Sequence, residues 1–360
     1  MRRLAALVLI ALLALTPIAG VMAQASPAAS PQASPVVASD REISFQSGPD
    51  TLYGSLMVPD GLTAPAPGVL IISGSGPTDR NGDSSGLPMG TNRHFAEDFA
   101  ALGVVTFRYD KLGSGKTGLG THADGQGIDY DLFMQEAWDA FDVLAKQPEV
   151  DPTLIVILGH SEGGLFAIDM ATDQTRETRP AGIILAAPLA IRYLDLLREQ
   201  IAGQYDALVA EGQLTEAVAK TLLGQLDETI AEIRDTGTLT TKLLDPGVQM
   251  LLSPANVPFL YQADQRDPLT LVTEVPQDMP VMIIHGAKDE QVTTAQMDQL
   301  AAAFEDSGHT HLTRLELPNA NHIFQVIEGE PDAAKNYADT SLPFSPEIEP
   351  ALREYMTAFD

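Results

Sequence analysis

The stretch LIVILGHSEG at residues 154–163 places a Gly-x-Ser-x-Gly turn directly after a β-branched apolar run. The apolar run predicts a buried strand, and apolar residues at helical spacing after residue 164 predict a helix. Glycines at positions 159 and 163 let two backbones approach where a Cβ would collide. This context predicts a nucleophile elbow, in which the Ser161 hydroxyl stands exposed at a helix N-terminus, where developing negative charge is favoured.

A serine becomes a useful nucleophile only with a base, and the base needs an orienting acid. Two later polar residues follow predicted strands in the order Ser, Asp, His: Asp289 comes after the strand at 281–284, and His322 after the strand at 312–317. Open α/β sheets place their sites at the carboxyl ends of strands. We therefore predict Ser161, Asp289 and His322 as a catalytic triad, with Glu290 as the alternative acid.

Apolar runs and helical patterns alternate along most of the chain, which predicts an α/β fold with a mostly parallel sheet and helices on both faces. The alternation breaks after residue 188, where apolar residues recur at helical spacing from 191 to 233. We expect residues 41–189 and 275–360 to form the catalytic domain and residues 190–274 a helical cap. An interface between two copies of the chain, forming a homodimer, is the alternative for this insertion. Predicted strands cover residues 42–46, 51–58, 68–72, 104–109, 154–158, 182–186, 281–284 and 312–317, and predicted helices 92–102 and 130–144.

Five segments in order resemble the α/β-hydrolase superfamily: residues 72–77, residues 107–117, the Ser161 elbow, residues 285–289 and residues 321–322. The resemblance covers roughly residue 41 to the C-terminus. It is to capped bacterial esterases related to the serine-aminopeptidase and dienelactone-hydrolase-like branches. It implies an α/β-hydrolase fold with a helical cap inserted before the strand that carries the acid.

An oxyanion hole needs two backbone N–H donors aimed at the carbonyl oxygen that gains charge. Glu162, the residue after the nucleophile, is expected to supply one donor. The resemblance implies that Ser75, in the loop after residue 72, supplies the other. Many relatives carry His-Gly where this chain has Ser73 and Gly74. That difference removes a histidine that braces the loop but keeps the main-chain donor.

Arg80 lies in a polar loop near the same predicted strand ends, and a second polar loop occupies residues 108–111. One interpretation is that Arg80 binds substrate; the other is that it belongs to an ion-pair network joining the two loops. His309 and His311 stand two residues apart before a strand, which we interpret as surface histidines and not as a metal site. No cofactor or metal is expected.

The N-terminus resembles a secretory signal, with Arg2 and Arg3 before an apolar run at residues 4–15 and small residues up to Ala23. We predict a signal peptide at 1–23 with cleavage near Ala23, and hence secretion. The apolar run is short for a spanning helix, which needs about 20 residues, so no stable membrane anchor is expected. Residues 24–40 are rich in Ala, Ser and Pro and predict a disordered linker.

The chain has 360 residues, a formal net charge of −28 and no cysteine. Such acidity argues against nucleic acid as a partner, and the absence of cysteine excludes disulfides and thiolate metal sites. We expect a secreted serine hydrolase that cleaves small-molecule carboxylic esters with small to medium uncharged acyl groups. A peptidase or amidase acting on short peptides, and a catalytically silent binding protein of the same fold, are the alternatives.

Overall fold

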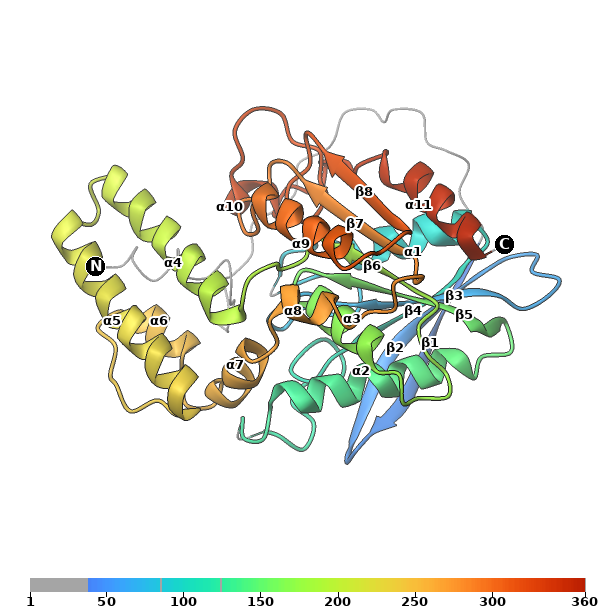
Figure 1. Cartoon of the computed structure of the whole chain (residues 1–360), viewed down its shortest axis with the longest axis horizontal. Coiled ribbons are helices and arrows are strands. Elements are labelled where there is room, and N and C mark those ends of the chain that lie inside the picture. The colour runs from blue at the N-terminus through green and yellow to red at the C-terminus, as the bar shows by residue number, and fades with distance from the viewer. Residues whose placement is uncertain (1–37, 85, 124, 360) are drawn as a thin grey trace, which may run out of the picture.

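A computed structural model describes residues 38–84, 86–123 and 125–359 of the chain. These residues form an eight-stranded sheet covered by helices on both faces, with a helical insertion extending from one side (Figure 1). The predicted signal peptide and residues 24–37 of the predicted linker lie outside the described residues. The first strand begins at Ala38, so the last three residues of the predicted linker belong to the sheet.

The sheet has the strand order β1-β2-β4-β3-β5-β6-β7-β8. Strands β1, β2 and β4 pair antiparallel, and all pairings from β4 through β3 to β8 are parallel, as the strand–helix alternation predicts. The carboxyl ends of β3, β5, β7 and β8 therefore share one edge. The strands are β1 (Ala38–Ser47), β2 (Asp50–Pro59), β3 (Ala66–Ile72), β4 (Val105–Asp110), β5 (Val150–His160), β6 (Gly182–Ala186), β7 (Val281–Gly286) and β8 (Leu312–Leu317).

Strand β5 explains how the sheet divides the core. Its residues Ile155 and Ile157 belong to the apolar core that the sheet forms with α2, α3 and α9. Val156 and Leu158 belong to a second apolar core, which the sheet forms with α1 and α11. A strand buried on both faces needs an unbroken apolar run, which residues 154–158 supply. The helices outside the insertion are α1 (Thr91–Ala101), α2 (Tyr130–Ala145), α3 (Glu162–Thr172), α9 (Thr294–Asp306), α10 (Ala333–Asn336), α11 (Ile348–Met356) and the 3₁₀ helix η2 (Thr357–Phe359).

Five helices lie between β6 and β7, within the predicted insertion 190–274. Two long helices, α4 and α5, extend away from the sheet, whereas α8 packs against α3 and α9 of the body (Figure 1). The last helix of the predicted insertion thus packs directly on the body of the molecule. The insertion comprises α4 (Tyr193–Ala210), α5 (Glu216–Thr236), α6 (Pro246–Leu251), α7 (Val257–Asp264) and α8 (Pro268–Val272).

A buried carboxylate fixes the base of the insertion. Asp264, at the end of α7, is fully buried and accepts hydrogen bonds from Arg192 at 2.7 Å, from Arg234 at 2.8 Å and from the Leu194 N–H at 2.9 Å. Two guanidinium groups and a backbone donor compensate for the desolvation of one carboxylate. These contacts hold the start of α4, the end of α5 and the end of α7 together at one carboxylate.

Candidate active site

Ser161 occupies a strained turn between β5 and α3. Its φ of 54° lies in the left-handed region, which costs about 1–3 kcal/mol for a residue other than glycine. A Cβ at Gly159 would lie 2.1 Å from the Gly163 oxygen, and one at Gly163 would lie 2.3 Å from the Ile72 oxygen. The two glycines are therefore required by close backbone approach, as the Gly-x-Ser-x-Gly pattern predicts.

His322 and Asp289 lie in contact at the same sheet edge. The loop after β7 carries Asp289 and the loop after β8 carries His322, with 2.7 Å between Asp289 Oδ2 and His322 Nδ1. Asp289 Oδ1 accepts hydrogen bonds from the N–H groups of Gln291 at 2.7 Å and Val292 at 2.9 Å. Burial alone would raise the pKa of Asp289, but the charge and hydrogen bond of His322, the charge of His285 and the Val292 N–H together lower the pKa below its ordinary value. The alternative acid, Glu290, instead accepts from the Ala333 N–H at 2.9 Å.

His160, inside the elbow, supports the His322 loop. Its Nε2 lies 3.0 Å from the His322 carbonyl oxygen. Burial, followed by repulsion from His322, lowers the pKa of His160 to about 3, so the ring is neutral. Because a carbonyl oxygen only accepts, Nε2 must carry the hydrogen. The sequence places His160 next to the nucleophile, but only the tertiary structure connects it with His322.

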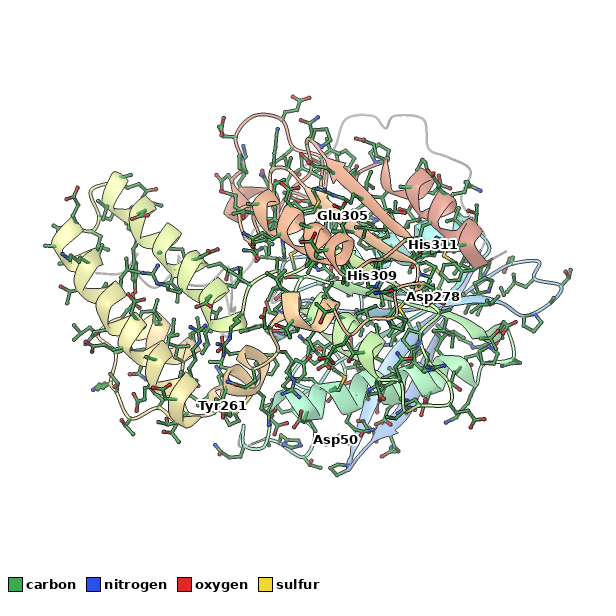
Figure 2. The ribbon with its side chains drawn as sticks, in the orientation of Figure 1. Asp50, Tyr261, Asp278, Glu305, His309 and His311 are labelled. Atoms are coloured by element: carbon green, nitrogen blue, oxygen red, sulfur yellow. The ribbon has the colours of Figure 1, made fainter. Side chains whose placement is uncertain are left out.

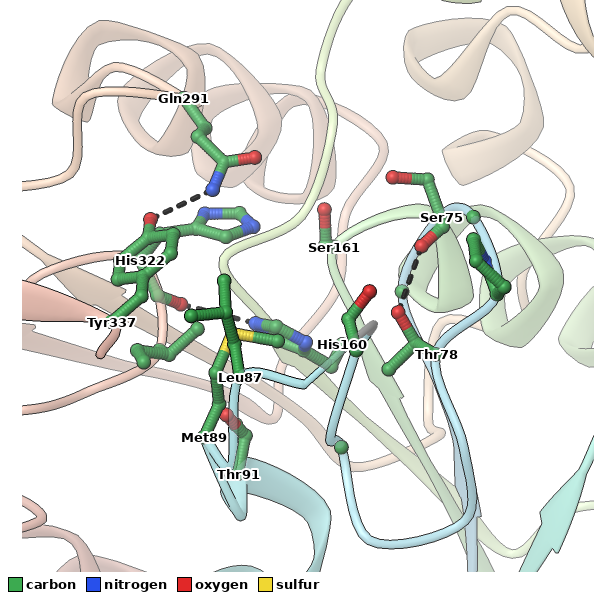
Figure 3. A pocket seen from close by; sticks show the side chains of 16 residues that line it. Ser75, Thr78, Leu87, Met89, Thr91, His160, Ser161, Gln291, His322 and Tyr337 are labelled. Carbon is green, nitrogen blue, oxygen red and sulfur yellow. Dashed lines mark hydrogen bonds between the residues drawn. The ribbon is translucent and has the colours of Figure 1, made fainter. Parts of the chain in front are cut away.

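Ser161 and His322 line one small cavity of about 60 Å³ (Figure 3). Within the described part of the chain, the Ser161 hydroxyl makes no hydrogen bond with His322; such bonds are often long or absent in substrate-free enzymes. Gln291 also lines this cavity and donates to the Tyr337 hydroxyl at 2.7 Å. Neither Gln291 nor Tyr337 has a sequence signal that could have identified it.

A larger cavity of about 370 Å³ is also lined by Ser161 and lies between the body and the insertion. Apolar side chains of α4 and α7, among them Leu196, Leu197 and Phe259, form much of its wall. Such concave, mostly apolar spaces with few polar groups are typical of small-molecule sites. The predicted cap therefore contributes directly to a space that reaches the serine.

The loop after β3 approaches Ser161 closely enough to supply a donor there. A Cβ at Gly74 would lie 3.2 Å from the Ser161 Cβ, and Ser75 lines both cavities. Within the described residues, neither the Ser75 N–H nor the Glu162 N–H donates a hydrogen bond, so both remain available. Ser73, which stands where many relatives carry histidine, accepts from Asn92 at 2.8 Å and donates to the Asp79 carbonyl at 3.1 Å.

Arg80 does not line either cavity, so the expectation of a substrate contact is corrected. Its guanidinium donates to Asp110 at 2.8 and 3.0 Å and to the Gly54 carbonyl at 2.9 Å, and its side chain is buried. Arg80 also pairs with Glu42 at 3.4 Å. These contacts are those of the alternative interpretation, an ion-pair network that joins two loops.

His309 and His311 lie between α9 and β8, on the body of the molecule (Figure 2). His311 is exposed, but His309 is buried, packs edge-on against Phe304 and contacts the Ser307 hydroxyl at 2.9 Å. The expectation of a surface position is therefore wrong for His309. Among the described residues, no group of three or more His, Cys, Asp or Glu could hold a metal ion. The same residues contain no helix long and apolar enough to span a membrane.

Residues 88–325, more than half of the chain, match the family described as "Serine aminopeptidase, S33". A local match joins the chain to esterase LipQ of Mycobacterium tuberculosis, with 40% identity over 47 residues. That segment spans 13% of this chain and only 11% of the relative.

Solved structures of three esterases resemble the whole fold. Est1E of Butyrivibrio proteoclasticus, solved with ferulic acid, matches with a TM-score of 0.53, 17% identity and coverage of 88% of this chain and 98% of its own. A Bacillus coagulans carboxyl esterase matches with a TM-score of 0.54 and 18% identity, over 89% of this chain and 98% of its own. The Pyrococcus furiosus esterase Pf2001 matches with a TM-score of 0.54 and 13% identity, over 94% of this chain and 99% of its own. At these identities the likeness establishes the fold. The chain is a hydrolase of the α/β-hydrolase fold and belongs to the serine aminopeptidase S33 family.

Proposed function

We propose that the chain is a secreted serine esterase that cleaves carboxylic esters through Ser161, His322 and Asp289. The observation that carries the proposal is the meeting of three parts at one point: the strained serine, the His322–Asp289 pair and two free N–H groups. Ser161 attacks the acyl carbon while His322 takes its proton, and Asp289 orients the imidazole. The Ser75 and Glu162 N–H groups stabilise the oxyanion. Water then hydrolyses the acyl-enzyme.

The two cavities suggest how an ester would be oriented. His322 lines the small cavity, and the leaving oxygen must accept its proton from the histidine. The alcohol part would therefore face the small cavity of about 60 Å³, and the acyl part the apolar cavity of about 370 Å³. This geometry favours uncharged, apolar acyl groups on small alcohols.

The family description favours a second candidate, cleavage of short peptides from their N-terminus. Such an enzyme needs a carboxylate to receive the substrate's α-ammonium group. Among the described residues that line the two cavities, Glu162 is the acidic one, and both of its carboxylate oxygens accept hydrogen bonds from protein groups. Ester hydrolysis is therefore the preferred function.

A substrate panel separates these candidates. We expect p-nitrophenyl esters of two- to eight-carbon acids to be hydrolysed far faster than aminoacyl-p-nitroanilides, with Ser161→Ala as the blank. Preferred cleavage of the anilides would replace the esterase proposal with the aminopeptidase. A chain that turns over neither and is not labelled by a fluorophosphonate would be a silent binding protein.

A further inference from the structure

A buried lysine connects the two loops that carry the proposed oxyanion donors. Lys111 follows β4, and its ammonium donates to the Gly74 carbonyl at 2.6 Å and to Glu162 Oε1 at 3.1 Å. Its side chain is only 9% exposed and that of Glu162 5%. An ion pair buried to this degree needs hydrogen bonds of this kind to offset its desolvation.

The first contact acts on the peptide that carries the Ser75 donor. The Gly74 carbonyl and the Ser75 N–H belong to one planar trans peptide group, in which the two bonds point in opposite directions. Holding the carbonyl oxygen therefore sets the direction of the N–H. A charged donor on the oxygen also polarises the peptide and strengthens hydrogen bonds from the N–H. The next carbonyl, that of Ser75, accepts from the Thr78 hydroxyl at 2.9 Å (Figure 3).

The second contact acts on the residue that carries the other donor. Glu162 is the first residue of α3, so its own N–H has no acceptor inside the helix. Its side chain turns toward Lys111 and, through Oε2, accepts from the Tyr193 hydroxyl at 2.5 Å. Tyr193 is the first residue of α4. Burial, then the charge of Glu162, raises the pKa of Tyr193 well above its ordinary value, so the phenol remains a donor.

We propose that Lys111 is the positioning residue of the oxyanion hole: it fixes the Ser75 and Glu162 N–H groups relative to one another, and Tyr193 couples the cap to this network. The proposal rests on the serine hydrolase function above. Because the oxyanion is absent from the bound substrate and develops only as the serine attacks, the contribution of Lys111 falls on kcat and not on substrate binding.

The competing interpretation is that Lys111, which also lines the large cavity, binds the carboxylate of an anionic acyl group. Two of its ammonium hydrogens are already directed at protein oxygens, and the Phe133 ring lies 5.6 Å away. A substrate carboxylate bound to Lys111 would also be repelled by the carboxylate of Glu162, which lies beside the same ammonium group. The positioning role therefore agrees better with the contacts.

Lys111→Met tests the proposal, with Lys116→Met as the matched control. Lys116 lies five residues further along the chain, pairs with Glu42 at 2.5 Å on the surface and lines neither cavity. Complete loss of one oxyanion donor lowers kcat by about 10²–10³-fold. In Lys111→Met both N–H groups remain but are no longer held in direction, so we expect kcat to fall by about 10–100-fold. We expect KM for p-nitrophenyl butyrate to change by less than about threefold. The second-order rate of Ser161 labelling by a fluorophosphonate should fall in parallel, because that reaction also places charge on an oxygen in the hole.

Lys111→Met leaves Glu162 as an unpaired buried charge, so the double variant Lys111→Met/Glu162→Gln is measured beside it. Thermal unfolding shows whether each variant is folded. If Lys111→Met does not fold, the double variant is used for the kinetic test instead. A folded variant with wild-type labelling and kcat would overturn the proposal. Loss confined to p-nitrophenyl hemisuccinate, an anionic acyl ester, would instead assign Lys111 to substrate binding. A wild-type enzyme that is labelled at Ser161 but hydrolyses no ester would contradict the esterase function alone. The role of Lys111 would then still be tested by comparing the labelling rates of the wild type and the Lys111 variants.

Discussion

Nδ1 of His322 lies 2.7 Å from Oδ2 of Asp289, and both residues lie in loops at the carboxyl ends of neighbouring strands. Since a carboxylate whose pKa is lowered can only accept, Nδ1 must carry the hydrogen in this contact. The neutral ring then presents an unprotonated Nε2, the form that can take a proton from a serine. The relationship therefore fixes the imidazole tautomer that the proposed mechanism needs.

Asp289→Asn should lower kcat by about 10³–10⁴-fold, because an amide no longer holds the required tautomer. Glu290→Gln should leave hydrolysis near wild type, since Glu290 contacts the Ala333 N–H and an amide oxygen can accept the same bond. Steady-state hydrolysis of p-nitrophenyl butyrate by both variants checks this. The reverse order of effects would move the acid to Glu290.

Hydrolysis should decline on the acid side with a single ionisation, because the general base of the reaction must be unprotonated to accept the serine proton. The two groups in contact with His322 add no further step between about pH 5 and 8. The lowered pKa of Asp289 keeps that carboxylate ionised, and the pKa of His160, about 3, keeps that ring neutral. A profile of kcat/KM against pH measures this. Two acid-side ionisations, or none, would contradict the assignment of the base.

The sequence was sufficient to predict the sheet and the position of Ser161, Asp289 and His322 at one of its edges. Buried strands of a parallel sheet need unbroken apolar runs, and polar residues directly after such runs mark one sheet edge. The pattern could not predict the surroundings of Glu162, because Lys111 and Tyr193 meet it from separate elements. Arg80 was ambiguous for the same reason: only the fold shows that Asp110 lies beside it.

Glu136→Gln should make the protein more stable, increasingly so as pH rises. Glu136 is buried and accepts from the Leu112 N–H at 3.1 Å, and burial raises its pKa from 4.5 to about 8. Between these values the folded state keeps a proton that the unfolded chain releases, so this group lowers stability progressively up to about pH 8. A glutamine has no proton to lose.

Thermal unfolding of wild type and Glu136→Gln at about pH 5 and about pH 8 provides the measurement. We expect the difference in Tm to be larger at the higher pH. Glu228→Gln, on the exposed side of α5, serves as the matched control. A Tm difference that is equal at both pH values would show that Glu136 titrates alike in both states.

Leu196→Trp should shorten the acyl groups that the enzyme accepts. Leu196 lines the large cavity and is 6% exposed, so the larger ring occupies space there. Removing room for a few methylenes should lower the ratio of octanoate to acetate hydrolysis by about tenfold or more. Leu244→Trp is the matched control, because Leu244 is 65% exposed and lines neither cavity. An unchanged ratio in the Leu196 variant would mean that the acyl group lies elsewhere.

Ser161→Ala tests the central claim most directly, with thermal unfolding as the check that the fold is intact. The account predicts that the folded variant loses ester hydrolysis by several orders of magnitude, up to about 10⁶-fold, and is no longer labelled by a fluorophosphonate. Hydrolysis by the variant within about tenfold of wild type would contradict the account, because Ser161 would then not be the nucleophile.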